Sequence, residues 1–170
     1  MDFFGDGSFY LLDAPGHTIG HLGGLARTTT APDTFIFMGG DLCHHGGEIR
    51  PSAHQPIPDK VHLHEPQDAW LSGQLFRDIN VKRGRKEDQP IFDPLEDATA
   101  DVPASMKTIR ETQVADADED VFFVFAHDMS IDGVVDLFPL PANDWKSKGW
   151  RERVRWSFLE DLIPALETGS

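Results

Sequence analysis

The sequence has few cysteines, few basic residues and no long apolar run, and each shortage argues against a class of protein. Cys43 is the only cysteine among 170 residues, so no intrachain disulfide can form and nothing indicates an oxidising compartment. Only 15 lysines and arginines stand against 29 acidic residues, a net charge of −14 that disfavours a nucleic-acid surface. No apolar run is long enough to span a bilayer, and residues 1–7 lack the features of a signal peptide. We therefore expect a cytosolic protein that binds neither nucleic acid nor membrane.

The apolar residues that are present suffice for a folded core. Hydrophobic residues make up 39% of the chain, with 12 phenylalanines and 4 tryptophans, which is not a disordered composition. A chain of this length normally forms one domain. We expect a single domain over residues 1–170.

Strand signals dominate the first forty residues. Apolar runs at residues 9–12, 22–28 and 35–38 are separated by glycine- and proline-containing turns, which predicts a meander of antiparallel strands. Residues 121–125 form the clearest buried strand. These strands are apolar on both faces in places, which suits a sheet covered by helices on one side and by a second sheet on the other. The expected class is α/β.

Helical spacing follows later in the chain. Residues 66–81 and 103–115 are predicted helices, the second with Asp101 as its cap. A final amphipathic helix is expected to run from Trp150 to Pro164. Residues 42–65 have little periodicity and are interpreted as a long functional loop.

Potential metal ligands follow three of the predicted strands. His17 comes after residues 9–12, Asp41 after residues 35–38 and His127 after residues 121–125. Imidazole and carboxylate are ligands that suit zinc and other divalent transition metals. An isolated histidine or aspartate is more often a solvated or turn residue, so the three together carry the hypothesis.

At these residues the chain resembles the C-terminal half of a metallo-β-lactamase superfamily hydrolase. The resemblance lies in Ala-Pro-Gly-His-Thr-Ile-Gly-His at residues 14–21, Gly-Gly-Asp ending at Asp41, and Ala-His-Asp at residues 126–128. It implies an αββα sandwich with two zinc ions, His17 on one ion, His127 on the other, and Asp41 bridging both as the catalytic carboxylate. It also implies zinc-dependent hydrolysis of a small-molecule ester, lactone, lactam or thioester. Lactonase-like members are the most similar in these residues, and thioesterase members are a close alternative.

One family segment is missing from the sequence. The His-x-His-x-Asp-His stretch, which lies N-terminal to the Pro-Gly-His-Thr segment in that family, is absent, and thirteen residues precede Ala14. We therefore expect an incomplete sandwich that is weak or inactive by itself. Its uncovered sheet face could make it a homo-oligomer. A non-catalytic remnant or binding domain of the same fold is the alternative.

Neighbouring side chains have expected roles as well. His21 and Thr18 are candidates for holding a ligand imidazole in place, although His21 could equally be a structural histidine. His44 and His45 are expected to line the substrate pocket. The run His62-Leu63-His64 is interpreted as a loop and not as a metal motif.

Three further groups receive simpler interpretations. Glu48 and Arg50 are candidates for the same loop beside Asp41, and the simpler alternative is a surface pair that contributes little. The acidic run at residues 116–120 is interpreted as a solvated turn because it lacks the glycine and glutamate of a calcium loop. Trp145, Trp150 and Trp156 are expected in the core or on a helix face.

Overall fold

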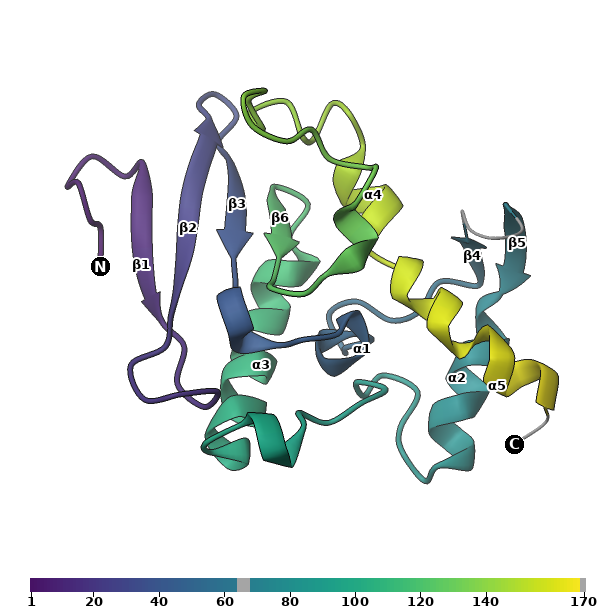
Figure 1. The fold of residues 1–170 in the computed structure, drawn as a ribbon. Coiled ribbons are helices and arrows are strands. Elements are labelled where there is room, and N and C mark those ends of the chain that lie inside the picture. Colours follow the sequence, from purple (N-terminus) through teal and green to yellow (C-terminus); the bar gives the residue numbers. More distant parts are fainter. Residues whose placement is uncertain (64–67, 169–170) are drawn as a thin grey trace.

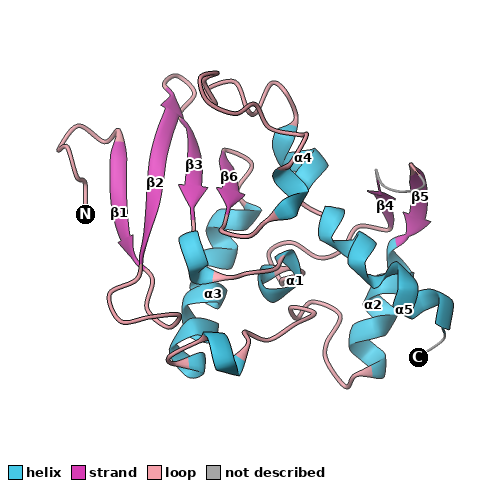
Figure 2. Cartoon of the chain, viewed as in Figure 1, coloured by secondary structure: helices cyan, strands magenta, loops and turns pink. Residues whose placement is uncertain are grey.

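The computed structural model describes residues 1–63 and 68–168 as a mixed α/β fold (Figures 1 and 2). Its larger sheet has the strand order β1-β2-β3-β6, and a smaller sheet pairs β4 with β5. The strands are β1 Phe9–Asp13, β2 Leu22–Thr29, β3 Thr34–Met38, β4 Lys60–Leu63, β5 Ala69–Ser72 and β6 Val121–Val124. The α-helices are α1 Gly46–Ile49, α2 Gly73–Lys82, α3 Val102–Ala117, α4 Trp150–Val154 and α5 Ile163–Thr168. The 3-10 helices are η1 Gly40–Leu42, η2 Glu96–Ala98, η3 Met129–Ile131 and η4 Ser157–Leu162.

The predicted meander is confirmed. Strand β2 pairs antiparallel with both β1 and β3, and β6 adds in parallel to β3 with Phe35 opposite Val121 and Met38 opposite Val124. Strands β1, β3 and β6 therefore all run in one direction, and their carboxyl ends meet at one edge of the sheet (Figure 1).

Helix α3 covers one face of this sheet. Leu25, Phe37 and Phe123 occupy paired positions on neighbouring strands, and they pack with Ile109 of α3 in one cluster. The side chain of Asp101 accepts the N–H of Ala104 at 3.0 Å, so the predicted cap is confirmed. A cap of this kind contributes about 1 kcal/mol.

The opposite face is covered at its β6 end by the segment that leads into α4. Phe122 packs with Trp145, Trp150 and Val154 in a second buried cluster. Trp145 is fully buried, and its ring N–H donates to Thr28 Oγ1 at 3.1 Å. The expectation that these tryptophans belong to the core is confirmed for Trp145 and Trp150.

A third cluster forms between the small sheet, α2 and η4. The small sheet and α2 lie beyond α1 as seen from the four-stranded sheet (Figure 1). Trp156 lies at the border of this cluster. The buried members are apolar residues from these elements and from the loops beside them: Ile57, Val61, Leu63, Phe76, Ile91, Phe158, Leu159 and Leu162. The small sheet lies apart from the four-stranded sheet (Figure 1).

Two element predictions in this region were wrong. Residues 42–65 are not one loop, because they contain α1 and β4. The helix expected over residues 66–81 begins only at Gly73, where Ser72 Oγ accepts the N–H of Gln74 at 3.3 Å. Leu71 is instead a strand residue opposite Val61, because pairing with β4 outweighs its helical spacing.

The final helix was also predicted wrongly. It divides into α4, η4 and α5. Pro164 does not end it but is the second residue of α5, where its missing N–H would have no partner in any case.

Two groups of charged residues that could have been solvated are buried. Arg50 and Asp116 are both buried and pair through two nitrogen–oxygen contacts, one of them 2.9 Å long. Asp116 therefore belongs to the interior and to α3, not to a solvated turn. Glu48 is buried and accepts the N–H of His44 at 3.2 Å, which excludes the alternative of a surface pair between Glu48 and Arg50.

Within residues 1–63 and 68–168, every helix is too short or too polar to cross a membrane.

Candidate metal centre

The shared direction of β1, β3 and β6 brings three loops together. His17 follows β1, Asp41 lies in η1 directly after β3, and His127 follows β6. His44 comes three residues after Asp41, on the short stretch between η1 and α1. Ligand-binding residues commonly collect at the carboxyl ends of strands, and here the topology places four candidates at one such edge.

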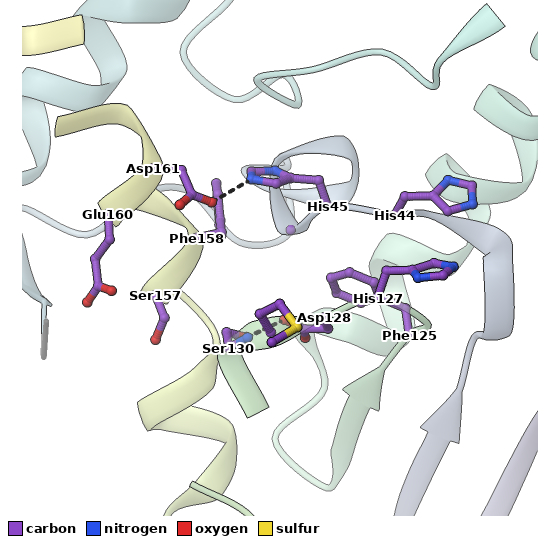
Figure 3. Close-up of a pocket in the computed structure, with 12 residues that line it drawn as sticks. His44, His45, Phe125, His127, Asp128, Ser130, Ser157, Phe158, Glu160 and Asp161 are labelled. Atoms are coloured by element: carbon purple, nitrogen blue, oxygen red, sulfur yellow. Dashed lines mark hydrogen bonds and ion pairs between the residues drawn. The ribbon is translucent and has the colours of Figure 1, made fainter. Parts of the chain in front are cut away.

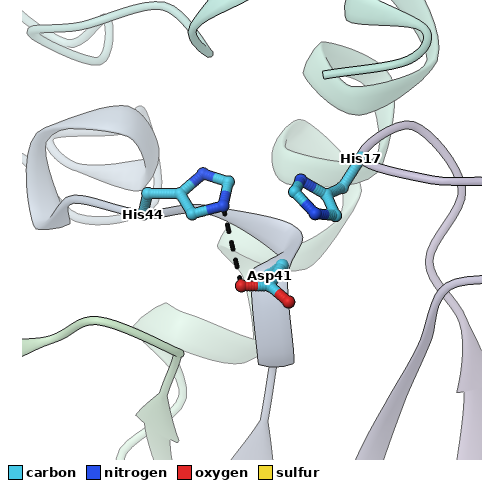
Figure 4. Close-up of side chains that lie close together, drawn as sticks. All are labelled: His17, Asp41 and His44. Atoms are coloured by element: carbon cyan, nitrogen blue, oxygen red, sulfur yellow. Dashed lines mark ion pairs between the residues drawn. The ribbon is translucent and has the colours of Figure 1, made fainter. Parts of the chain in front are cut away.

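The side chains of His17, Asp41 and His44 converge (Figure 4). One ligand atom from each lies within 4.8 Å of the others. His44 Nε2 is 3.6 Å from Asp41 Oδ1, and His127 Nε2 approaches the same oxygen at 3.4 Å. Two imidazoles and a carboxylate could hold a zinc ion.

One ring nitrogen of His17 supports this arrangement. His17 Nδ1 is buried and has no hydrogen-bond partner among the described residues. Buried polar atoms normally have partners, so an unpaired nitrogen within this cluster is consistent with a cation-binding position.

The loop that carries His17 is fixed to helix α3. Thr108 Oγ1 donates to the carbonyl of Pro15 at 2.7 Å, and the N–H of Asp101 donates to the carbonyl of Gly16 at 2.9 Å. The N–H of Ala100 donates to the carbonyl of His17, also at 2.9 Å. The backbone around His17 is thereby held before any ligand binds.

His44 is close to the other imidazoles. Its ring centroid lies 4.9 Å from that of His17 and 5.7 Å from that of His127. Burial lowers the pKa of the His44 imidazole, His17 and His127 lower it further, and Asp41 opposes the shift. The neutral imidazole, which is the form that binds metal, is thereby favoured.

His127 lies at the open side of the group. Its side chain is 70% exposed, and its φ of 64° is left-handed, which is uncommon for a residue with a Cβ. It contacts the cluster of three through the Asp41 oxygen and through stacking with the His44 ring.

His21 lies beside the cluster with both ring nitrogens engaged. Its Nδ1 is 3.0 Å from the carbonyl of Ala14, and its Nε2 accepts the N–H of Asp41 at 3.0 Å. Thr18 is exposed, and its carbonyl accepts the N–H of His21 at 3.4 Å.

His45 lies on the other side of His44, in the wall of a cavity of about 280 Å³ (Figure 3). Its Nδ1 accepts the N–H of Gly47 at 2.9 Å, and its Nε2 pairs with Asp161 at 3.1 Å. The cavity also borders His44 and His127. Its other lining residues are Gly46, Phe125, Asp128, Met129, Ser130, Ser157, Phe158, Glu160 and Asp161.

The His62-Leu63-His64 run is separate from this cluster. His62 lies in β4, pairs with Asp68 at 3.0 Å and stacks on Trp70. His64 is outside the described residues.

Sequence reasoning did not assign His44 to the cluster. A signal was available, because a residue three positions after Asp41 can return to it across a turn of 3-10 helix. The turn itself was not predicted.

Comparison with known proteins confirms the expected resemblance. The chain is 42% identical over 171 residues to metallo-hydrolase mfmC of Annulohypoxylon moriforme. It is equally identical over 170 residues to γ-lactamase FDB1 of Fusarium pseudograminearum. These matches cover 98% and 96% of this chain. A further relative, 42% identical over 167 residues, is cytochrome P450 monooxygenase mpaDE of Penicillium roqueforti.

The matched share of each relative is smaller. The chain spans 43% of the metallo-hydrolase, 40% of the γ-lactamase and 18% of the monooxygenase. No family model matches the chain. No solved structure matches it either.

Proposed function

We propose that this chain, a homologue of metallo-hydrolases over almost all of its length, supplies one side of a zinc site that opens a lactam or lactone ring. The observation that carries the proposal is the convergence of His17, His44 and Asp41 at the carboxyl edge of the sheet. His127 reaches the same carboxylate from a fourth position.

Each residue has a defined part in this proposal. His17 and His44 would hold the ion through imidazole nitrogens, and Asp41 would contribute the carboxylate oxygen that both His44 and His127 approach. When bound, a divalent cation polarises the scissile carbonyl and activates a water molecule. Asp41 would also help to orient the attacking water, which is the catalytic role we assign to it.

A second zinc ion needs more ligands than these residues offer. Structural and catalytic zinc sites use at least three protein ligands each, and the 170 residues contain no His-x-His-x-Asp-His segment. We propose that further polypeptide, of the kind that makes up the rest of the longer relatives, supplies the remaining ligands and a second sheet to complete the sandwich. The chain alone would then bind zinc weakly and turn over slowly.

The cavity beside the site favours an uncharged substrate. Its wall carries the carboxylates of Asp128, Glu160 and Asp161, and no lysine or arginine. Together with a net charge of −14, this wall repels anionic substrates. A thioester on a phosphate-bearing carrier is therefore disfavoured relative to a neutral ring.

The names of the relatives support the same choice. One relative is named γ-lactamase and another metallo-hydrolase. A γ-lactam is neutral and small enough for a cavity of about 280 Å³. Its hydrolysis joins a water oxygen to the carbonyl carbon, breaks the C–N bond and transfers a proton to the ring nitrogen.

The proposal is tested first on zinc and then on turnover. We expect the isolated chain to hold no more than one zinc ion after dialysis, measured by elemental analysis. Fused to the portion of the metallo-hydrolase relative that lies outside the match, it should hydrolyse a neutral γ-lactam. In that fusion His17→Ala and Asp41→Asn should each lower the rate by about 100-fold or more, since several kcal/mol of charge stabilisation is lost.

The matched control is His54→Ala, which removes an exposed histidine that is not among the candidate ligands. It should leave zinc content and rate unchanged. A folded fusion that binds zinc but opens neither lactam nor lactone would favour the alternative of a non-catalytic remnant. Full activity in Asp41→Asn would show that the carboxylate has been assigned wrongly.

A further inference from the structure

We infer that His21 is a positioning residue that locks the loop of His17 to the backbone of Asp41 and so fixes the spacing of the two ligands. The inference rests on the proposed metal site, but its geometry can be tested without metal. It concerns a half-buried side chain that the proposed chemistry does not itself use.

The hydrogen bonds of His21 allow one tautomer. The backbone N–H of Asp41 can only donate, so His21 Nε2, at 3.0 Å, must be the unprotonated acceptor. The carbonyl of Ala14 can only accept, so His21 Nδ1, also at 3.0 Å, must carry the proton. A neutral imidazole with hydrogen on Nδ1 satisfies both bonds, and neither nitrogen is then free to bind a metal.

The same residue closes the loop that carries His17. The N–H of Ala14 donates to the carbonyl of His21 at 3.1 Å, while the His21 ring reaches back to the carbonyl of Ala14. Two hydrogen bonds between Ala14 and His21 therefore close the loop of residues 15–20. The His17 ring lies within this loop, 5.9 Å from the His21 ring between centroids.

The residue before Asp41 leaves room for the imidazole. Gly40 has a φ of +58°, and a Cβ there would lie 2.9 Å from His21 Nε2. The carbonyl of Gly40 also accepts the N–H of Ala126 at 2.8 Å, directly before His127. Hydrogen bonds thus run from the His17 loop, through His21, to the backbone at Asp41 and on to the strand end at His127.

This continuity explains why His21 affects metal binding without contacting metal. Metal sites require their ligands in place to within about 0.5 Å. Removing a group that orients a ligand typically lowers metal affinity by about 10- to 100-fold.

Two amide substitutions separate the two bonds of His21. In His21→Asn the side-chain amide takes the position of Nδ1 and can still donate to the carbonyl of Ala14. In His21→Gln the side-chain amide takes the position of Nε2, and its oxygen can still accept the N–H of Asp41. His21→Ala removes both bonds, and His54→Ala is the matched control.

The first measurement is binding of Zn²⁺ or Co²⁺ alone to the full chain, with the visible spectrum of Co²⁺ reporting ligand geometry. We expect His21→Ala to bind about 10- to 100-fold more weakly. His21→Gln should keep more affinity than His21→Asn, because it retains the bond to the Asp41 backbone. Thermal melting of the metal-free variants identifies any that merely fail to fold.

The second measurement uses the wild-type chain without metal. Nitrogen-15 NMR of the imidazoles should show His21 protonated on Nδ1 and unprotonated on Nε2. The opposite tautomer, or wild-type Co²⁺ affinity and spectrum in a folded His21→Ala, would overturn the inference. A wild-type chain that shows the expected tautomer but binds no metal would instead contradict the proposed function.

Discussion

Gly16 lies so close to Ser105 that a Cβ atom on Gly16 would stand 2.3 Å from the Ser105 backbone. The φ of Gly16, +135°, is also in the region that side chains rarely adopt. The segment that leads to His17 thus packs directly against the first turn of α3.

Gly16→Ala should therefore be costly. We expect it to lower the free energy of unfolding by about 1–3 kcal/mol through overpacking, and to weaken zinc binding because His17 must move. Urea denaturation and zinc titration measure the two effects. Gly20→Ala is the control, since Gly20 also has a positive φ but a Cβ atom there would have no other atom within 4 Å. Equal losses in both variants would mean that contact with α3 is unimportant.

The buried pair of Arg50 and Asp116 gives a second prediction. Asp116→Leu should destabilise the protein by about 3–5 kcal/mol, because it leaves the Arg50 guanidinium buried and unpaired. The double variant Arg50→Met with Asp116→Leu should recover much of that loss, since no charge is then left alone. Chemical denaturation measures the free energy of unfolding of each variant. A double variant as unstable as Asp116→Leu alone would show that the two side chains stabilise the fold by more than cancelling each other's charge.

Cys43 should be unreactive in the folded protein. Burial raises the pKa of its thiol well above the usual range, and the charge of Glu48 raises it further. We expect no labelling by a disulfide reagent at pH 8, and full labelling in urea. Ser147→Cys, at an exposed position, should add one thiol that reacts at once. Rapid labelling of the wild type would imply that the core around Cys43 opens readily.

The acidic cavity predicts a dependence on substrate charge. In the active fusion, a neutral lactone should react faster than the same ring bearing a carboxylate. Glu160→Gln, in the cavity wall, should narrow this difference by about 2- to 5-fold, the effect of one partly screened charge. The two lactones are compared by kcat/KM. An unchanged ratio would place the substrate away from Glu160.

The fold was predictable where local signals and tertiary contacts agree. Asp101 caps α3 as its position in the sequence indicates, and the strands of the meander are bounded by clear turn residues. Leu71 shows the opposite case, because its helical spacing is real but its partner Val61 holds it in a strand. That partner lies in the preceding strand, so the spacing of apolar residues after Leu71 does not reveal it.

The site was predictable in part for a similar reason. His17, Asp41 and His127 follow apolar strands, and the shared direction of those strands decides that they meet. His44 joins them only because η1 turns the chain back toward Asp41. Asp116 was misread because its partner Arg50 is 66 residues away.

The parallel pairing of β6 with β3 also has a kinetic consequence. The two strands are separated by residues 39–120, so they join only after a long loop has closed, whereas β1, β2 and β3 can pair as neighbouring hairpins. Loop-closure entropy must be overcome before such distant contacts stabilise the chain. We therefore expect the meander to form first in refolding and β6 to dock late. The metal centre would then be among the last parts of the protein to assemble.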